Sequence, residues 1–380
     1  MKICLLLTYP ETHLREIHAR EPALGSLSFK EQIRTLAGEI PEATTWWAPA
    51  LQKSGHDVRV VIANDEPSQT QWAREKLGAN WKPEGPWLHH LVIEQLKKIK
   101  PEVLLITDLM TFDGSFAMRV HDRVPCLVGW TSQLLPDRVR LRGFDLVVSP
   151  HDTCVRQATE FGASEARMLR PGFPRSIAEA VFQTPICTDV VCFARWPVND
   201  LESQRHLTAL AAASRRPNNG FSLGLYLDAP ADALLPEPIR EIKRAPLHGL
   251  ARYRAMTSAR LIFADPSGAG DGSGTSLAIH EGAGLGVAVL ARETFAAASA
   301  FALDRETFGY RDCDDLIAKL DSLLVLQNAP QLEQAGRAAQ ERCLTEHSME
   351  ILSGELASLF APRKRRGESR RLKVRRKLGF

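Results

Sequence analysis

The sequence predicts an α/β protein built from two Rossmann-like lobes that face each other across a cleft. The 380 residues exceed an average domain by about two- to threefold, which favours two domains. Short apolar runs alternate with helical stretches in two successive series, as is typical of βα units around a parallel sheet. The proline-containing segment from Met168 to Thr188 separates the two series, so we interpret it as a linker.

The first series starts with a buried strand at Ile3–Leu7. Gly55 follows the predicted helix Thr45–Lys53 at the position where a left-handed C-cap favours glycine. Pro101 follows the helix Leu88–Ile99, because proline cannot continue a helix. Four further strands are expected at Val58–Ile62, Val103–Ile106, Cys126–Gly129 and Leu146–Ser149, with another helix at Glu31–Ala37.

The second series repeats this pattern from residue 188 onward. Strands are expected at Val190–Phe193, Leu223–Tyr226, Ala259–Ala264, Val287–Ala291 and Phe308–Tyr310, with helices at Leu201–Ser214, Leu250–Met256, Ser276–Ala283, Cys313–Leu324 and Pro330–Leu359. We therefore expect an N-terminal lobe over 1–170, a linker over 171–187, a C-terminal lobe over 188–345, the end of a long C-terminal helix over 346–361, and a basic tail over 362–380.

The composition indicates a soluble protein of a reducing compartment. Hydrophobic residues make up 44% and charged residues 24% of the chain, which is ordinary for globular proteins. No apolar run reaches the roughly 18 residues of a membrane span. The seven cysteines are odd in number and lack CxxC spacing, which argues against a disulfide framework or a thiolate zinc site. We expect a cytoplasmic protein.

The positive charge is concentrated at the C-terminal end. Residues 361–380 contain ten Lys or Arg against Glu368, a charge of +9, so the rest of the chain carries −6 of the net +3. Such a tail is a disordered terminus, or it attracts an anionic membrane surface at roughly 1 kcal/mol per basic residue, or it binds nucleic acid non-specifically. No motif indicates a specific nucleic-acid partner.

A glycine-rich segment after the strand Ala259–Ala264 is the most informative stretch. Gly272 and Gly274 allow backbone N–H groups to approach an anion, and Thr275 with Ser276 begins a helix whose N-terminus favours negative charge. This arrangement suits a diphosphate. Inside the helix, Glu281 is placed to accept hydrogen bonds from both ribose hydroxyls of a nucleotide. The alternative is a tight strand–loop–helix connection in which the glycines only permit the turn.

This segment resembles the donor-binding region of B-type (GT-B) glycosyltransferases, in which a short helix bears a ribose-binding glutamate. Their usual upstream acid is replaced here by Ser273. A narrower resemblance is to the CgeB-like (spore-protein-type) glycosyltransferases, whose glutamate and paired glycines correspond to Glu281, Gly282 and Gly284. That family has Asn, Arg and Phe where this chain has Ser276, Ala278 and His280.

The resemblance extends in order along the chain, through Ser28–Gln32, Asn64–Ala73, Gly129–Ser149 and Glu346–Ser348. It implies transfer of a sugar from a nucleotide-sugar donor on the second lobe to an acceptor on the first. The implied acceptor is a glycan, a lipid-linked glycan or another hydroxyl compound, as in polysaccharide biosynthesis. It also implies that no metal or other cofactor is needed.

Two arginines are candidates for the donor diphosphate. Arg195 follows the first strand of the second lobe, at the edge of the sheet where open α/β proteins bind ligands. Arg205 lies on the next predicted helix, where it either assists Arg195 or, as the simpler interpretation, belongs to a solvated helix face.

The candidate catalytic residues lie in the first lobe. An inverting transferase needs a carboxylate or imidazole to take the acceptor proton, whereas a retaining one relies more on stabilising the leaving diphosphate. We single out His18, Glu31 and Asp108. Structural alternatives are a helix cap by Asp108 before Thr111–Val120 and a capping box of Ser28 with Glu31. His13, Ser132 and Gln133 complete the set.

The segment Asp312–Asp315 has the form of a DxD metal motif, but acids also cluster in first helical turns, so we expect it to cap the helix Leu316–Leu324. Two other functions stay open. One is another nucleotide-sugar enzyme of the same fold, such as an epimerase, and the other is a non-catalytic binding or scaffold protein.

Overall fold

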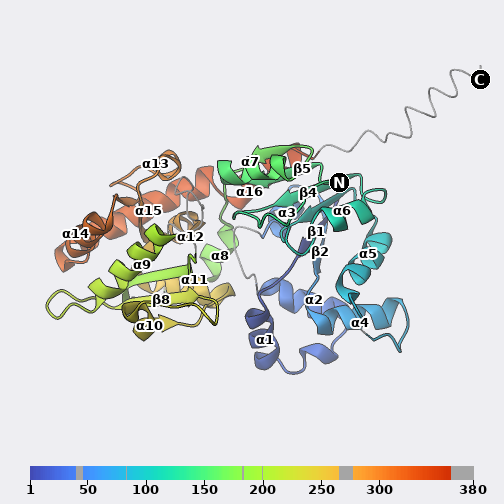
Figure 1. Cartoon of the computed structure of the whole chain (residues 1–380), viewed down its shortest axis with the longest axis horizontal. Coiled ribbons are helices and arrows are strands. Elements are labelled where there is room, and N and C mark those ends of the chain that lie inside the picture. Colours follow the sequence, from blue (N-terminus) through green and yellow to red (C-terminus); the bar gives the residue numbers. More distant parts are fainter. Residues whose placement is uncertain (40–45, 83, 182–183, 199, 265–276, 361–380) are drawn as a thin grey trace, which may run out of the picture.

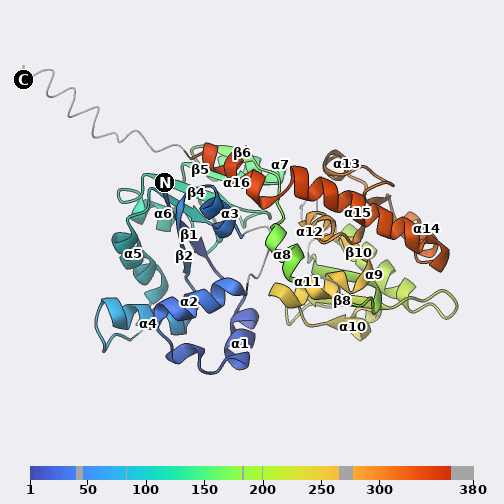
Figure 2. The same ribbon diagram turned by 180° about the vertical axis from the view of Figure 1, so that it is seen from behind.

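The computed structural model describes residues 1–39, 46–82, 84–181, 184–198, 200–264 and 277–360. Two α/β lobes lie side by side, the first drawn in blue to green together with the red C-terminal helix, and the second in yellow-green to orange-red (Figures 1 and 2). Each lobe has a sheet of six strands, and every strand pairing in both sheets is parallel. The predicted two-lobed architecture is confirmed.

The first sheet has the order β2-β1-β3-β4-β5-β6. Its inner strands are buried along almost their full length because helices cover both faces of a parallel sheet. The strands are β1 (Lys2–Leu7), β2 (Asp57–Ile62), β3 (Val103–Ile106), β4 (Cys126–Trp130), β5 (Leu146–Ser149) and β6 (Ala166–Met168). The helices are α1 (Glu11–Arg20), α2 (Phe29–Gly38), α3 (Ala48–Lys53), α4 (Glu66–Lys76), α5 (Trp87–Ile99), α6 (Gly114–Val120) and α7 (Asp152–Glu160).

The second sheet has the order β12-β11-β10-β7-β8-β9. Its strands are β7 (Thr188–Arg195), β8 (Leu223–Asp228), β9 (Lys243–Arg244), β10 (Ala259–Ala264), β11 (Ala288–Arg292) and β12 (Phe308–Tyr310). The helices are α8 (Arg175–Ala180), α9 (Leu201–Ser214), α10 (Glu237–Ile242), α11 (Gly249–Thr257), α12 (Leu277–Leu285), α13 (Phe295–Ala300), α14 (Cys313–Leu323) and α15 (Ala329–Glu346). Sequence patterns missed β6 and β9 because both are very short, mostly exposed edge strands.

The predicted single helix Pro330–Leu359 is wrong, because the chain leaves helical geometry at His347 and Ser348. Phe173 of the linker pairs with this break: its N–H donates to the His347 carbonyl (3.0 Å), and its carbonyl accepts from Met349 N (3.1 Å). Ser348 then caps a new helix, α16 (Met349–Ser358), through its hydroxyl and Ile351 N. This helix returns to the first lobe and packs beside α3 (Figure 2).

The two sheets place their topological switch points opposite each other. In the first sheet β2 and β3 flank β1, and in the second β8 and β10 flank β7. Open α/β sheets bind ligands at the carboxyl ends of strands at such points. None of the helices in the described ranges combines the length and apolar character needed to cross a bilayer.

Candidate active site between the lobes

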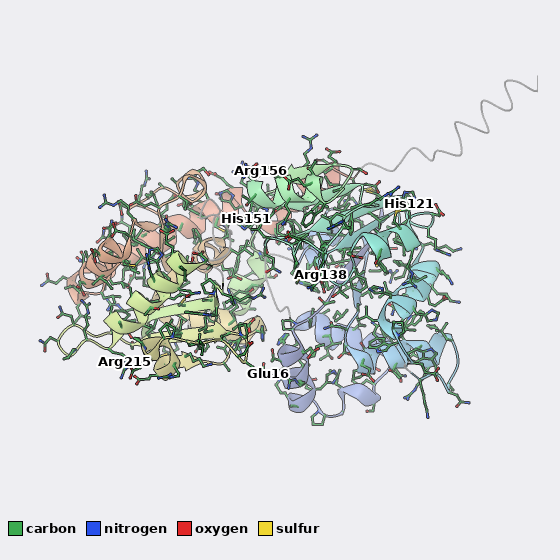
Figure 3. All side chains as sticks on the ribbon, in the orientation of Figure 1. Glu16, His121, Arg138, His151, Arg156 and Arg215 are labelled. Atoms are coloured by element: carbon green, nitrogen blue, oxygen red, sulfur yellow. The ribbon has the colours of Figure 1, made fainter. Side chains whose placement is uncertain are left out.

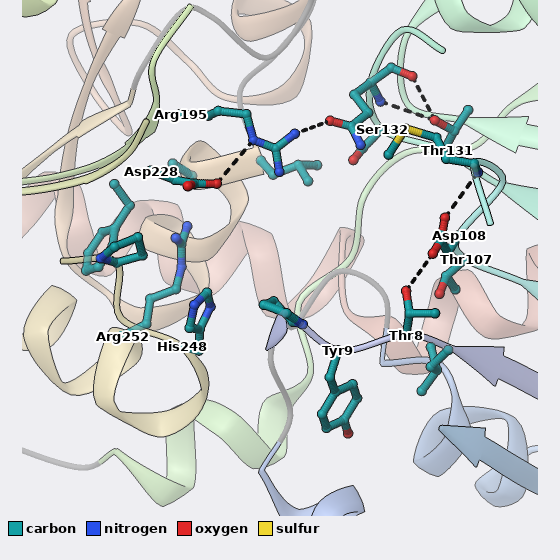
Figure 4. Close-up of a pocket in the computed structure, with 18 of the residues that line it drawn as sticks. Thr8, Tyr9, Thr107, Asp108, Thr131, Ser132, Arg195, Asp228, His248 and Arg252 are labelled. Atoms are coloured by element: carbon teal, nitrogen blue, oxygen red, sulfur yellow. Dashed lines mark hydrogen bonds and ion pairs between the residues drawn. The ribbon is translucent and has the colours of Figure 1, made fainter. Parts of the chain in front are cut away.

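A pocket of about 700 Å³ lies between the lobes where the carboxyl ends of the strands meet (Figure 4). The first lobe contributes the segments that follow β1, β3 and β4, and the second contributes the ends of β7 and β8 with the start of α11. Both switch points therefore open into one cavity. Its polar lining consists of Thr8, Tyr9, Thr12, Thr107, Asp108, Thr131, Ser132, Gln133, His151, Arg195, Tyr226, Asp228, His248 and Arg252.

Arg195 reaches the pocket from the end of β7. Its guanidinium Nη1 donates to Gln133 Oε1 across the two lobes (2.8 Å), and its Nε lies 3.6 Å from Asp228 Oδ2. The side chain is 67% exposed, so both contacts are open to solvent and exchange readily with a ligand. Arg195, chosen from the sequence, thus lines the pocket, and its contact with a donor stays a prediction.

Arg252 of α11 is the second arginine of the pocket, and the sequence analysis missed it. Its guanidinium carbon lies 4.4 Å from the ring centre of Phe193, within cation–π distance. Phe193 is itself stacked on Tyr226, with ring centres 4.8 Å apart. An arginine on an amphipathic helix gives no sequence signal of its own. Only the fold brings it to the end of β7.

The buried Glu281 forms an ion pair with Arg252. Its carboxylate is only 1% exposed; Oε2 accepts from Arg252 Nη2 (2.6 Å), and Oε1 accepts from the Tyr253 hydroxyl (3.2 Å). In this structure Glu281 does not line the pocket, whereas Leu277 and Ala278 of the same helix do. The carboxylate thus contacts the pocket through Arg252.

The glycines of α12 serve close packing. A Cβ on Gly284 would lie 2.2 Å from Phe173 Cδ1, and a Cβ on Gly282 would lie 2.5 Å from Val289 Cγ2. Both positions therefore admit only hydrogen without a shift of their neighbours. The expected donor-loop residues Gly272, Gly274, Thr275 and Ser276 lie outside the described residues.

His248 lines the pocket and contacts the other lobe. Its Nε2 lies 3.2 Å from the Thr12 hydroxyl, and its ring centre is 5.3 Å from that of His13. Burial, with smaller effects of His13 and Arg252, lowers the pKa of His248 to about 4. The imidazole is therefore neutral near pH 7.

Of His18, Glu31 and Asp108, only Asp108 lines the pocket; Ser132 and Gln133 of the wider candidate set also line it, and His13 does not. Asp108 Oδ2 accepts from the Thr8 hydroxyl (2.8 Å), and its Oδ1 accepts from Met110 N (3.1 Å) and Thr111 N (3.0 Å). Asp108 therefore closes a tight turn after β3. The expected helix Thr111–Val120 instead begins at Gly114, with Asp113 as its N-cap.

The structure does not bring His18, Glu31 or Arg205 to the lining of the pocket. His18 Nε2 contacts the buried Asp65 (2.7 Å). Glu31 forms the capping box with Ser28, and hydrogen bonds from Ser28 lower the pKa of its carboxyl. Arg205 is exposed on α9. Sequence position alone could not exclude these residues, because distance to the pocket appears only in the folded chain.

Asp312 caps α14, with its side chain accepting from Asp315 N (2.9 Å), which confirms the interpretation of Asp312–Asp315 as a helix start.

Comparison with known proteins supports the same fold. Residues 231–353 match a family model described as glycosyl transferase-like; this range contains Arg252 and Glu281. Among solved structures, HepE from Anabaena in complex with UDP-glucose has a TM-score of 0.56 at 13% identity, covering 94% of this chain and 98% of that one. Comparison with curated protein sequences gave no match.

Two further solved structures agree. AviGT4, a glycosyltransferase involved in avilamycin A biosynthesis, has a TM-score of 0.55 at 14% identity, covering 94% of this chain and 96% of that one. Sucrose-phosphate synthase from Thermosynechococcus elongatus has a TM-score of 0.54 at 11% identity, with coverages of 94% and 98%. The chain thus has the two-lobed B-type glycosyltransferase fold and carries a glycosyl transferase-like domain, as the sequence predicted.

Proposed function

We propose that this protein transfers a sugar from a nucleotide-sugar donor, bound on the second lobe, to a hydroxyl acceptor on the first. The observation that carries the proposal is the pair Arg195 and Arg252. Both belong to the second lobe, and both line the pocket that lies between the switch points of the two sheets. Guanidinium groups suit phosphate oxygens because they donate in a planar fork. The complex of the similarly folded HepE with UDP-glucose supports a donor of this class.

In the proposed reaction, an acceptor hydroxyl oxygen bonds to the anomeric carbon of the donor sugar. The bond from that carbon to the diphosphate oxygen breaks, and the nucleoside diphosphate leaves with the bonding electrons. Arg195 and Arg252 stabilise the charge that develops on it. The hydroxyl proton passes to a base or to the leaving diphosphate. Of the three catalytic candidates we retain Asp108 for this role, because it lines the pocket.

Glu281 has two roles in this proposal, and the first is indirect, since its carboxylate fixes the guanidinium of Arg252. A contact between Glu281 and the ribose hydroxyls, and a diphosphate cradle at Gly272, Gly274, Thr275 and Ser276, are parts of the same proposal. So are independence from metal ions, the narrower CgeB-like assignment, and attraction of the basic tail to an anionic membrane.

A thermal-shift screen of UDP-, GDP-, TDP- and CMP-linked sugars tests the proposal. We expect one nucleotide class to stabilise the wild type, and Arg252→Gln and Glu281→Ala to weaken the shift. Arg254→Gln is the matched control, because Arg254 is exposed on the same helix and does not line the pocket. A chain that no nucleotide sugar stabilises would be a binding or scaffold protein. Donor turnover that needs no acceptor would instead favour an epimerase-like enzyme.

A further inference from the structure

The charged side chains of the pocket are divided unequally between the two lobes. The second lobe contributes the charged side chains of Arg195, Arg252 and Asp228, and each lobe contributes one imidazole, His151 from the first and His248 from the second. Among the described lining residues of the first lobe, Asp108 is the charged side chain, and none is Lys or Arg. Arg138 is exposed on the side of the first lobe that faces the second (Figure 3) but does not line the pocket.

Backbone charge does not replace the missing cations. Helices α1 and α7 begin directly after the lining residues Pro10 and His151, and a helix N-terminus favours an anion by about 0.3–1 kcal/mol. Each of these helices already carries an acid in its first turn, Glu11 in α1 and Asp152 in α7. These carboxylates offset the partial positive charge at the first-lobe wall.

The wall is instead rich in groups that suit neutral hydroxyls. Thr8, Thr131, Ser132 and Gln133 supply hydrogen-bonding side chains, and Met110, which is 48% exposed, supplies an apolar contact. Arg195 of the second lobe is the cation that reaches this wall, through its contact with Gln133, and the proposed function assigns it to the donor diphosphate. With the donor bound, an anion on this wall would lose water without gaining a cation from the first lobe, which is costly, and it would approach the carboxylate of Asp108. A neutral hydroxyl compound meets neither penalty.

We infer that the acceptor presents an uncharged hydroxyl-bearing group to the first-lobe wall, such as an unphosphorylated sugar ring, and that sugar phosphates are rejected there. This inference rests on the proposed function, because it assigns the first lobe to the acceptor. In the transfer step, the hydroxyl that forms the new bond to the anomeric carbon therefore belongs to a neutral compound, and the only anionic product is the nucleoside diphosphate.

The test uses the full chain saturated with the nucleoside diphosphate identified in the donor screen, so that the cations of the second lobe are occupied. Glucose 6-phosphate is then titrated by calorimetry against the wild type, Met110→Lys and Met118→Lys. Met118 is 50% exposed on α6 of the same lobe and lies outside the pocket lining, so it controls for added surface charge.

We expect no saturable binding by the wild type or Met118→Lys, and at least roughly tenfold tighter binding by Met110→Lys, because a charged hydrogen bond to phosphate is gained. Wild-type binding as tight as that of Met110→Lys would overturn the inference, and equal binding by the two lysine variants would count against it. Failure of the proposed function has a different signature, since no nucleotide sugar would then stabilise the chain in the donor screen.

Discussion

The two walls of the pocket are built on different principles. On the second lobe, Arg252 is fixed between the Phe193 ring and the buried carboxylate of Glu281. On the first lobe, most of the lining residues lie in loops, and Asp108 is the carboxylate among side chains that are otherwise hydroxyl, amide, imidazole, aromatic or apolar groups. A fixed cation suits an anionic ligand such as a diphosphate. Neutral hydrogen-bonding groups instead distinguish between ligands by the geometry of their hydroxyls. Under the proposed function, we therefore expect donor recognition to depend on the fixed charge of Arg252 and acceptor recognition to depend on shape.

The largest effect is expected from removing the fixed cation, Arg252. Arg252→Gln is expected to lower kcat/KM roughly 100-fold, about 2.7 kcal/mol, because it withdraws charge stabilisation from the leaving diphosphate. Steady-state kinetics with the donor varied would measure this loss. Arg254→Gln should remain within about twofold of wild type. Equal effects of the two substitutions would show that Arg252 has no special place in the site.

Helix α12, which carries Glu281, depends on close packing against Phe173, and Gly284→Ala tests this packing. The added Cβ would meet the Phe173 ring at 2.2 Å, and such overpacking typically costs about 1–3 kcal/mol of unfolding free energy. Urea unfolding would measure the loss. Gly354→Ala on α16 is the control, since a Cβ there meets nothing within 4 Å and alanine favours a helix. A Gly284 variant as stable as the Gly354 variant would contradict the packing argument.

The buried His280 on α12 makes the unfolding free energy depend on pH. Burial lowers the pKa of His280 to about 3, against about 6.5 in the unfolded chain. The unfolded state therefore binds the proton first, and stability present above pH 6.5 is lost as the pH falls toward 3. His280 contributes up to about 1.4 kcal/mol per pH unit to this loss.

His280→Phe should make the unfolding free energy less dependent on pH between 6.5 and 5, as measured by urea unfolding at each pH. His121 is exposed on the first lobe, and His121→Asn should leave the slope unchanged. Identical slopes for wild type and His280→Phe would remove His280 as the cause.

The smallest effects are expected outside the pocket. His18→Asn and Arg205→Gln should change kcat/KM by less than about twofold, because neither residue lines the pocket. Glu31→Ala should lower the urea midpoint of unfolding slightly through the lost capping box, while its activity at 25 °C stays near that of wild type. A hundredfold loss of turnover in any of the three would restore that residue as a catalytic candidate.

Local sequence patterns were sufficient for the fold. Strands such as Ile3–Leu7 and Val103–Ile106 are continuous apolar runs, and their burial in a parallel sheet follows directly from that composition. The same reasoning failed at His347 and Ser348, because the helix break is stabilised by pairing with the distant Phe173. Local helical pattern contains no information about that partner.

The sequence predicted pocket residues only where they lie at the carboxyl end of a strand. Arg195 and Asp108 follow β7 and β3, so the topology alone places them at the pocket. Arg252 and His248 depend on how α11 packs against Phe193 and α12, which no spacing in the sequence reveals. Glu281 was identified for its carboxylate, but its buried partners, Arg252 and Tyr253, emerged only from the structure.

The pairing of Phe173 with the His347–Met349 segment also makes the second lobe an insertion within the first. The first lobe contains both β1 and α16, and Met349, Leu352 and Leu356 belong to its hydrophobic core. The chain leaves this lobe and re-enters it at adjacent points, since Phe173 N lies 3.0 Å from the His347 carbonyl oxygen. The second lobe is thus nested inside a split first lobe, and a polypeptide ending before Met349 would lose part of the core of the lobe with which it began.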